Sequence, residues 1–516
     1  MNGAELLVKT ALAADITICF SNPGTTEIPV VAALDTIGGI KPVLGLFEGV
    51  CTGAADGYGR ITGKPAMTLL HLGPGFANGI ANLHNARRAR TPIVNVIGEH
   101  ATWHVANDPP LAMDIASLAG TVSVWQRTST SANEVGRDMA DAVTSALAGR
   151  ITTLIVPNDL QQMPVSDEVG PTASFAFNPV NVSVIERAAR MLKSGKKAAL
   201  FMGGRALREG GLHAAARIKA ATGCDLLAGS FPVCMDRGAG LPAVRRIPYF
   251  PEAALGLLSN YEAFVFAGAA EPVSFFGYPG IPGRLLAENR ERISVWTDGQ
   301  DEIQVLENLA DALGAPPLSR LEGTVFAASG RPALPTGQLT AEKVCLVLAA
   351  LQPEGAIIVD EGLTTAFSYY GVSGGAPRHS LMTIAGGSIG YGLPCATGAA
   401  LASPGRRIIS FQADGSALYT VQALWTQARE GLDITTLICS NRSYRIIETE
   451  FSRSGMESLG SSAKALSSLS PPSIDWVSIA RGFGVPAVAV ETAEALVREI
   501  GTSLSEPGPR LIEMLL

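Results

Sequence analysis

The sequence predicts an α/β protein with three doubly wound domains, each built around a parallel sheet. Short apolar runs, such as "PAMTLLHL", "TPIVNVIG", "KAALFMGG", "GAIIVDEG" and "ITTLICSN", alternate with Ala-rich helical stretches. This alternation is typical of parallel strands, because each parallel connection has to cross the sheet and usually does so as a helix. The chain has 516 residues, and domains of roughly 100 to 200 residues predict about three of them.

Two segments interrupt this alternation and mark the domain boundaries. Residues 164–180 and 319–340 are rich in Pro, Gly, Ser and Thr, and we interpret them as linkers. We therefore expect a first domain over residues 1–170, a middle domain over 181–318 and a third domain over 340–516.

Composition favours a protein that acts on small molecules. The net charge is -7, and the interleaved charges form no basic stripe for nucleic acid. The seven cysteines are scattered without a CxxC pair, so we expect reduced core residues in a cytoplasmic protein. The start "MNGAELLVKTALAAD" lacks the basic region and cleavage site of a signal peptide. The sequence has no run of about 18 apolar residues, so no membrane span is expected.

The stretch "FQADGSALYTVQALWTQAREGLDITTLICSNRSY", residues 411 to 444, carries the most specific chemistry. It predicts a buried strand, a turn, a helix and a second buried strand. Ligands of open α/β sheets bind beyond the carboxyl ends of strands, where Asp414 and Asn441 would lie. The Asp414 carboxylate, the Asn441 amide oxygen and the Ser443 carbonyl are hard oxygen ligands of the kind that Mg²⁺ prefers. The alternative is two ordinary turns, since Asp-Gly and Ser-Asn are common turn pairs.

The same stretch resembles the thiamine diphosphate binding motif, written GDG, a spacer of some two dozen residues, and NN. Here the motif reads Ala413-Asp414-Gly415, then 24 residues, then Ser440-Asn441. Ala413 replaces the first glycine, and Ser440 replaces the first asparagine. The resemblance implies thiamine diphosphate and Mg²⁺ as cofactors, with Asp414, Asn441 and Ser443 as the metal ligands.

Further stretches match this superfamily in the same order along the chain. "AGGSIGYGLPCATGAAL" (385–401) is similar to the glycine-rich segment before GDG, where the Gly387 carbonyl would meet the cofactor's 4'-amino group and Ile389 would bend the cofactor. "VDEGLTTA" (359–366) resembles the strand end whose Leu363 and Thr364 approach the diphosphate. The resemblance further implies cofactor contacts at Thr25, Asn78, Ala413, Gly415, Ser416, Tyr419 and Tyr444.

Glu48 is the predicted activating group. "LFEGVCTGAADGYGR" (46–60) looks like the segment that carries the family's catalytic glutamate. The resemblance implies that this carboxyl exchanges a proton with the pyrimidine of the cofactor, so that the thiazolium carbon can lose its own proton. The alternative is that Glu48 only caps the helix that follows it.

The nearest resemblances within the superfamily are to benzoylformate decarboxylase and the acetolactate synthase large subunit. "SNPGTTE" (21–27) matches the early NPG turn of both, with Thr25 where the decarboxylase has a pocket serine. His71 stands at the position of a catalytic histidine of the decarboxylase, and Phe275 takes the position of its second one. His104, on the loop "GEHATWHVANDPP", is a further candidate for proton transfer. Each histidine has a structural alternative, a buried one for His71 and a solvated one for His104.

The resemblance implies an enzyme that adds the cofactor to the carbonyl of a 2-oxo acid, releases carbon dioxide, and then protonates the intermediate or passes it to an acceptor carbonyl. Arg445 favours an acidic substrate, although a surface ion pair would explain it equally well. A homodimer or homotetramer with sites shared between subunits is implied. The alternatives are a lyase acting on 2-hydroxyacyl thioesters and a non-catalytic subunit that only binds thiamine diphosphate. FAD is not predicted, because "FMGGRALREGG" lacks a GxGxxG fingerprint.

Overall fold

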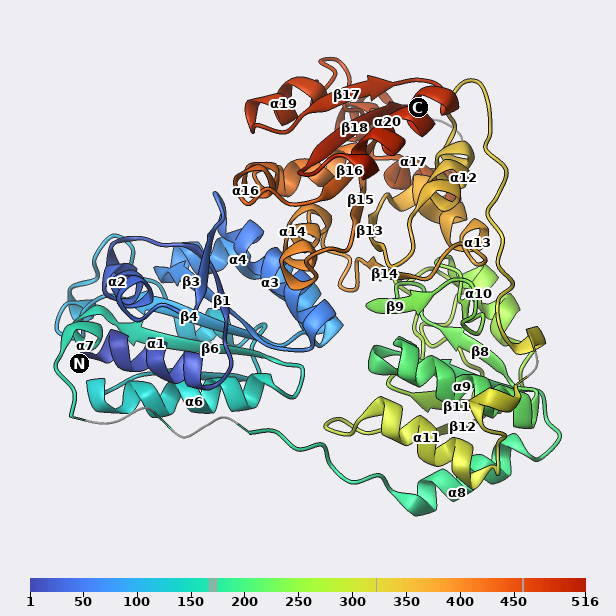
Figure 1. The fold of residues 1–516 in the computed structure, drawn as a ribbon, viewed down its shortest axis with the longest axis horizontal. Helices are drawn as coiled ribbons and strands as arrows, with labels where there is room; N and C mark the ends of the chain where they lie inside the picture. The colour runs from blue at the N-terminus through green and yellow to red at the C-terminus, as the bar shows by residue number, and fades with distance from the viewer. Residues whose placement is uncertain (167–169, 171–173, 322, 457–458) are drawn as a thin grey trace.

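The computed structural model describes residues 1–516 except 167–169, 171–173, 322 and 457–458. These exceptions fall within the two predicted linkers and in the third domain, so the linkers are described only in part. Figure 1 shows three α/β lobes, with the middle lobe connected to the first by an extended segment. The prediction of three parallel-sheet domains is confirmed.

The N-terminal domain contains a parallel six-stranded sheet. In sheet order its strands are β2 (Lys41–Leu44), β1 (Ile18–Asn22), β3 (Ala66–His71), β4 (Ile93–Glu99), β6 (Ile151–Pro157) and β5 (Trp125–Thr128). Its helices are α1 (Gly3–Ala13), α2 (Ile28–Ile37), α3 (Glu48–Thr62), α4 (Leu72–Ala89), α5 (Ile115–Ala119), α6 (Val135–Ala146) and α7 (Asn158–Gln162). Met67 and Leu69 of β3 belong to one core and Leu70 to another, because alternate residues of a strand face opposite sides.

The middle domain repeats this arrangement with five strands. They run in the order β10 (Arg245–Arg246), β8 (Asp225–Ala228), β7 (Ala198–Met202), β11 (Ala263–Ala267) and β12 (Glu291–Ser294). Its helices are α8 (Val182–Leu192), α9 (Glu209–Thr222), α10 (Pro251–Leu258) and α11 (Glu302–Ala312).

The C-terminal domain contains a seven-stranded sheet. The order is β17 (Ala487–Val490), β18 (Arg510–Leu515), β16 (Ile434–Ser440), β15 (Ile408–Ala413), β13 (Ile357–Glu361), β14 (His379–Thr383) and β9 (Cys234–Arg237). Its helices are α12 (Ala341–Leu351), α13 (Tyr369–Val372), α14 (Gly392–Ala402), α15 (Asp414–Ala417), α16 (Ala423–Arg429), α17 (Arg445–Arg453), α18 (Ser461–Ser467), α19 (Trp476–Gly482) and α20 (Ala493–Ser505).

One strand of this sheet comes from the middle domain. β9 pairs antiparallel with β14, with Arg237 opposite His379. The middle segment of the chain therefore completes the edge of the C-terminal sheet, which the predicted domain boundaries did not anticipate.

Helices α3 and α14 join the N-terminal and C-terminal domains at close range. A Cβ atom at Gly398 would lie 1.8 Å from the carbonyl oxygen of Ala54, and one at Gly57 would lie 2.0 Å from that of Cys395. Only glycine permits this backbone-to-backbone packing. Because Glu48 begins α3, the packing fixes its position relative to the C-terminal domain.

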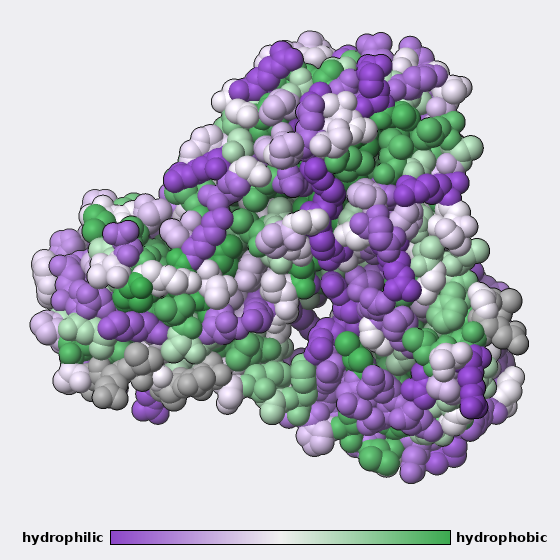
Figure 2. All heavy atoms as spheres, viewed as in Figure 1, coloured by the Kyte–Doolittle hydropathy of each residue, from purple (hydrophilic) through white to green (hydrophobic). Residues whose placement is uncertain are grey.

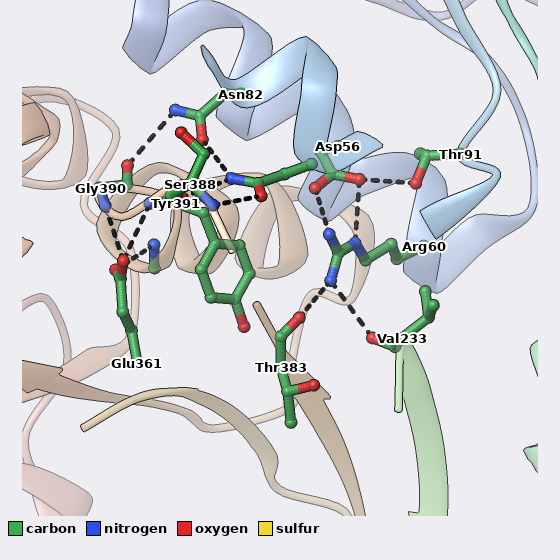
Figure 3. A network of polar contacts seen from close by, with 12 residues as sticks. Asp56, Arg60, Asn82, Thr91, Val233, Glu361, Thr383, Ser388, Gly390 and Tyr391 are labelled. Atoms are coloured by element: carbon green, nitrogen blue, oxygen red, sulfur yellow. Dashed lines mark hydrogen bonds and ion pairs between the residues drawn. The ribbon is translucent and has the colours of Figure 1, made fainter. Parts of the chain in front are cut away.

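A buried arginine ties all three domains together (Figure 3). Arg60 is 8% exposed and forms a two-pronged ion pair with Asp56, at 2.6 and 2.9 Å. It also donates to the carbonyl oxygens of Thr383 and Val233, at 2.8 and 3.3 Å.

Within the described ranges, the helices are all too short or too polar to cross a bilayer. Figure 2 shows hydrophobic and hydrophilic residues interspersed over the visible face of all three lobes. All seven cysteines are buried and unpaired, as predicted for core residues.

Candidate active site

Asp414 and Asn441 lie at neighbouring strand ends, as the sequence predicts. β15 and β16 are parallel, with Ala413 paired to Cys439, so both strands end at the same edge. The Asp414 carboxylate is 2% exposed and accepts hydrogen bonds from the backbone N–H groups of Gly415 and Arg442, at 2.9 and 2.7 Å. Burial raises the pKa of Asp414, although these N–H groups oppose the shift.

The oxygen atoms at this edge suit a hard cation. The Asn441 amide oxygen accepts from the backbone N–H of Ser443 at 3.0 Å, and Arg442 between them has a φ of 58°. In the part of the chain that the structure describes, no group of three or more His, Cys, Asp or Glu is placed to hold a metal ion. A cation here would depend on the mixed oxygen set of Asp414, Asn441 and Ser443, and that set fits Mg²⁺.

The other predicted residues of the motif surround this edge. The Ser416 hydroxyl donates to the carbonyl oxygen of Ala413 at 3.2 Å. Tyr444 lies so close to Gly415 that a Cβ atom there would come 2.5 Å from the tyrosine ring. Tyr419 is 55% exposed and packs against Gly390 in the same way.

The loop with Gly387 and Ile389 is held by a carboxylate that the sequence did not single out. Glu361, at the end of β13, is 1% exposed and accepts from the backbone N–H groups of Gly390 and Gly392, at 2.6 and 2.8 Å (Figure 3). Burial raises the pKa of Glu361 to about 7 despite these bonds. Its signal in the sequence is its place in "VDEGLTTA", two residues before Leu363.

Helix α4 of the N-terminal domain forms hydrogen bonds to the same loop. The Asn82 amide donates to the carbonyl oxygens of Gly49 and Gly390, at 2.8 and 3.3 Å. The Asn85 amide donates to the carbonyl oxygen of Ser388 at 2.7 Å and accepts from its N–H at 3.2 Å (Figure 3). Asn82 thus contacts the residue after Glu48 and the residue after Ile389.

A cavity of about 510 Å³ opens beside this loop, between the middle and C-terminal domains. Leu363, Thr364, Gly387 and Ile389, all predicted to contact the cofactor, line it. Its other walls are largely aromatic and contain Phe231, Tyr249, Phe250, Phe275, Phe276 and Phe367. Phe275 packs directly against Gly387, since a Cβ atom there would come 2.6 Å from its ring. The described lining contains no residue of the N-terminal domain, so Glu48 does not line the cavity of its own chain.

The predicted catalytic groups of the N-terminal domain gather around Gly75. The Asn78 amide donates to a carboxylate oxygen of Glu48 at 3.0 Å. A Cβ atom at Gly75 would lie 2.9 Å from the other oxygen of Glu48 and 3.3 Å from Cβ of His71. The structure therefore brings Glu48, His71 and Asn78 together. Glu48 is also the first residue of α3, directly after the N-cap residue Phe47, so its charge lies in the first turn of the helix.

Glu27 is a further member of this group that the sequence reasoning missed. It is fully buried, and its carboxylate accepts from Gly24 N–H at 2.8 Å and from the Thr26 hydroxyl at 2.6 Å. It also bonds to Nδ1 of His71 at 2.8 Å. A side chain at Gly24 would collide with the His71 ring, and one at Gly98 with Glu27. Glu27 ends the stretch "SNPGTTE", in which only Thr25, here an exposed residue, was singled out.

His104 does not join this group through any described contact. It follows β4 on a loop where its ring packs against His100 and Trp103, with centroids 5.8 and 5.4 Å away. Its Nδ1 lies 3.3 Å from the Asn107 amide. Its predicted role in proton transfer gains no support from the geometry and stays a prediction.

The comparisons with known proteins agree with this architecture. The description "Thiamine pyrophosphate enzyme, N-terminal TPP binding domain" matches residues 1–118, and "Thiamine pyrophosphate enzyme, C-terminal TPP binding domain" matches residues 362–514. A Mycobacterium tuberculosis protein named "Putative acetolactate synthase large subunit IlvX" is 46% identical over 520 residues, which cover 100% of this chain and 99% of the relative.

Two further relatives come from the decarboxylases. Benzoylformate decarboxylase of Pseudomonas aeruginosa is 28% identical, over 97% of this chain and 96% of the relative. The thiamine diphosphate-dependent 4-hydroxybenzoylformate decarboxylase of Rhodococcus jostii shares the fold with a TM-score of 0.83 and 23% identity, over 100% of this chain and 99% of the other. The predicted resemblance is thereby confirmed: this chain belongs to the thiamine pyrophosphate enzyme family, among relatives named acetolactate synthase large subunit and benzoylformate decarboxylase.

Proposed function

We propose that this protein uses thiamine diphosphate and Mg²⁺ to cleave the bond between the carbonyl and carboxyl carbons of a 2-oxo acid. Carbon dioxide leaves, and the remaining acyl carbanion is protonated or transferred to an acceptor carbonyl. The observation that carries this proposal is the shared edge of β15 and β16, where Asp414 and Asn441 end neighbouring strands of the sheet whose loop with Gly387 and Ile389 lines the aromatic cavity. The names of the relatives support the same class of reaction.

The residues of the C-terminal domain would bind and orient the cofactor. Asp414, Asn441 and the Ser443 carbonyl would hold Mg²⁺ and, through it, the diphosphate. The Gly387 carbonyl and the Ile389 side chain would set the conformation of the bound cofactor, which supplies a carbanion sink at its thiazolium ring. With the cofactor and substrate bound, the aromatic walls of the cavity would reduce the access of water to the reacting carbonyl and so strengthen local electrostatic interactions.

The residues of the N-terminal domain would move protons. Glu48, oriented by Asn78, would exchange a proton with the pyrimidine ring of the cofactor. His71 is oriented by Glu27, which fixes the ring through Nδ1. Because Nδ1 is held by Glu27, Nε2 of His71 would be available to deliver or accept a proton at the substrate.

The two half-sites are proposed to meet between subunits. Ile28, Leu46 and Met113 of the N-terminal domain are 60%, 41% and 47% exposed, which is apolar surface beside the Glu48 group. A second copy of the chain would cover this surface and bring its own cavity to Glu48, in a homodimer or homotetramer. Light scattering after size-exclusion chromatography measures this directly, and a monomer at micromolar concentration would contradict it.

The test of the function is calorimetric titration of thiamine diphosphate with and without Mg²⁺, followed by carbon dioxide release from pyruvate and from benzoylformate. We expect metal-dependent binding and release from at least one acid. The absence of metal-dependent binding would overturn the proposal. Binding without release from any 2-oxo acid would leave the 2-hydroxyacyl thioester lyase and the non-catalytic binder as the two alternatives.

A further inference from the structure

Arg246 is a charged side chain in the wall of the aromatic cavity. It ends the short strand β10 and lines the same cavity as Gly387 and Ile389. Between the described residues, the structure contains no hydrogen bond or ion pair of its guanidinium group. Its described contact is with the ring of Tyr370, whose centroid lies 4.7 Å from the guanidinium carbon. A half-buried cation without a counter-ion is expected to attract an anion, because little solvent is left to stabilise it.

A second arginine lies on the same tyrosine ring as Arg246. Arg237 stacks on Tyr370 as well, at 3.7 Å, and is only 9% exposed. It donates to the Ser373 hydroxyl and to the Tyr370 carbonyl oxygen, at 2.9 and 2.6 Å, rather than to a carboxylate. Two guanidinium groups thus share one tyrosine ring.

Two carboxyl groups line the cavity as well. Asp360 is attracted to Arg246, but it lies beyond ion-pair distance and accepts from Gly362 N–H at 3.0 Å. Burial raises the pKa of Asp360 to about 6 and that of Glu361 to about 7. Glu361 is turned toward the first residues of α14, to which it is already bonded. Within the described residues, neither carboxyl group forms a hydrogen bond or ion pair with Arg246, so the N–H donors of its guanidinium group have no described partner.

The rest of the cavity suits an apolar body. Phe231, Tyr249 and Phe275 pack on one another, with ring centroids 5.4 to 5.9 Å apart. Phe275 touches Gly387 at the expected reaction centre, whereas Arg246 touches Tyr370 elsewhere in the wall. A molecule that reaches both places would present apolar or aromatic surface to the rings between them.

We propose that Arg246 binds a second acidic group of the substrate, so that the enzyme prefers 2-oxo acids with an apolar or aryl body and a distal carboxylate. The inference rests on the proposed function for the reaction at the 2-oxo group, and it adds the substrate class. The guanidinium group offers two parallel N–H donors to a carboxylate, which gives orientation as well as affinity.

The experiment compares substrates that differ only in the distal charge. The pairs are 4-carboxyphenylglyoxylate with benzoylformate, and 2-oxoadipate with 2-oxohexanoate. The enzymes are the wild type, Arg246→Gln, Arg246→Lys and Arg245→Gln, each as the full chain with thiamine diphosphate and Mg²⁺. Arg245 is the matched control, because it is the exposed neighbour on the same strand and does not line the cavity.

We expect the wild type to prefer the acidic member of at least one pair by about tenfold in kcat/KM, as for one charge-assisted hydrogen bond. Arg246→Gln should abolish this preference, mainly through KM, and leave the neutral member unchanged within about twofold. Arg246→Lys should restore part of it, and Arg245→Gln should behave as the wild type. A neutral preference in the wild type, or a preference that survives in Arg246→Gln, would overturn the inference while the proposed function stands.

A binding measurement separates the inference from the reaction. Terephthalate and its neutral diamide, terephthalamide, are titrated into the full chain, with and without the cofactors. We expect tighter binding of terephthalate that depends on Arg246. If this result is obtained and no 2-oxo acid is turned over, the proposed function fails and the anion site stands. Equal binding of the two compounds by the wild type counts against the site itself, and the unfolding temperatures of the variants show whether each is folded.

Discussion

Nδ1 of His71 lies 2.8 Å from a carboxylate oxygen of Glu27, in a pocket where Gly24 and Gly98 leave no room for another side chain. Glu27 is wholly buried and His71 is partly exposed, with 23% of its side chain accessible. The pair therefore engages one ring nitrogen and leaves the other, Nε2, without a hydrogen bond among the described residues. A carboxylate bonded to one nitrogen selects the tautomer and the orientation of an imidazole.

Glu27→Gln should lower kcat by about tenfold with little change in KM, because it weakens the orientation of His71 rather than substrate binding. The double variant with His71→Ala should be no slower than His71→Ala alone, since the two residues act as one unit. Steady-state kinetics with a 2-oxo acid that the enzyme decarboxylates measure kcat and KM of each variant. Additive losses would show that Glu27 acts only through the stability of the fold.

Glu48→Gln should keep metal-dependent thiamine diphosphate binding and lower turnover by at least about a hundredfold, as expected for a lost general acid–base. Asn78→Ala, which removes only the hydrogen bond to Glu48 at 3.0 Å, should cost less, roughly three- to tenfold. Calorimetry and carbon dioxide release on the same samples separate binding from chemistry. Unchanged turnover in Glu48→Gln would favour the capping role of this residue and a non-catalytic binder.

Asp414→Ala should abolish the dependence of thiamine diphosphate binding on Mg²⁺, and Asn441→Ala should weaken binding by about tenfold. The reason is that these residues supply the side-chain oxygens at the shared strand edge. Chelation of Mg²⁺ from the wild type should have the same effect as Asp414→Ala. Asp35→Ala, an exposed carboxylate of α2, is the control, and an equal loss there would mean that charge alone is being measured.

The pH dependence of stability should report the buried carboxyls of β13. Burial raises the pKa of Glu361 from 4.5 to about 7 and that of Asp360 from 3.8 to about 6. Between pH 3.8 and about 7 the folded chain therefore holds protons that the unfolded chain has lost, so the free energy of unfolding falls as the pH rises. Below that window both states are protonated, and the contribution is fully present.

Glu361→Gln should flatten this decline by up to about 3 kcal/mol, since one pKa unit corresponds to about 1.4 kcal/mol. Urea unfolding of the cofactor-free protein from pH 4.5 to 7.5 measures it. Glu342→Gln, an exposed acid of α12, should leave the slope unchanged. A slope that is the same in Glu361→Gln and the wild type would assign the pH dependence to other groups.

Arg60→Met should destabilise the protein by about 3–5 kcal/mol, because it leaves the buried Asp56 without its partner. Lys64→Met removes an exposed ion pair, since 57% of the Lys64 side chain and 65% of that of its partner Asp15 are accessible, and should cost about 1 kcal/mol or less. Thermal unfolding of both variants provides the comparison. Equal losses would show that the three-domain contact of Arg60 adds no stability.

The sequence could predict those site residues that lie directly after strands. Asp414, Asn441 and Gly387 follow apolar runs that are easily identified, and parallel strands bring such ends to one edge. Glu27 and Arg246 were not predicted. The role of Glu27 depends on its contact with His71, 44 residues away in sequence. The role of Arg246 depends on a cavity between two domains. His104 stays a prediction, because its described contacts are with His100, Trp103 and Asn107 of its own loop.

The parts of the fold that the sequence predicted are likewise those that local sequence patterns encode. Alternating apolar and helical segments reveal parallel units, but they do not show which sheet a short strand joins. "CMDR", the sequence of β9, has no strong strand signal, and its pairing with β14 depends on the packing of the two domains. The local sequence pattern therefore predicted the number of domains. It did not predict that a strand of the middle segment joins the C-terminal sheet.

The pairing of β9, from the middle segment of the chain, with β14 of the C-terminal sheet has a consequence for the design of chimaeric proteins. A middle domain exchanged with a relative at the two linkers would also exchange the outer strand of the C-terminal sheet. A C-terminal domain produced alone would expose the unpaired backbone of β14 along a free edge, which invites aggregation. The middle and C-terminal domains should therefore be transferred together as one unit. Recombination libraries should keep residues 234–237 with the sheet that they complete.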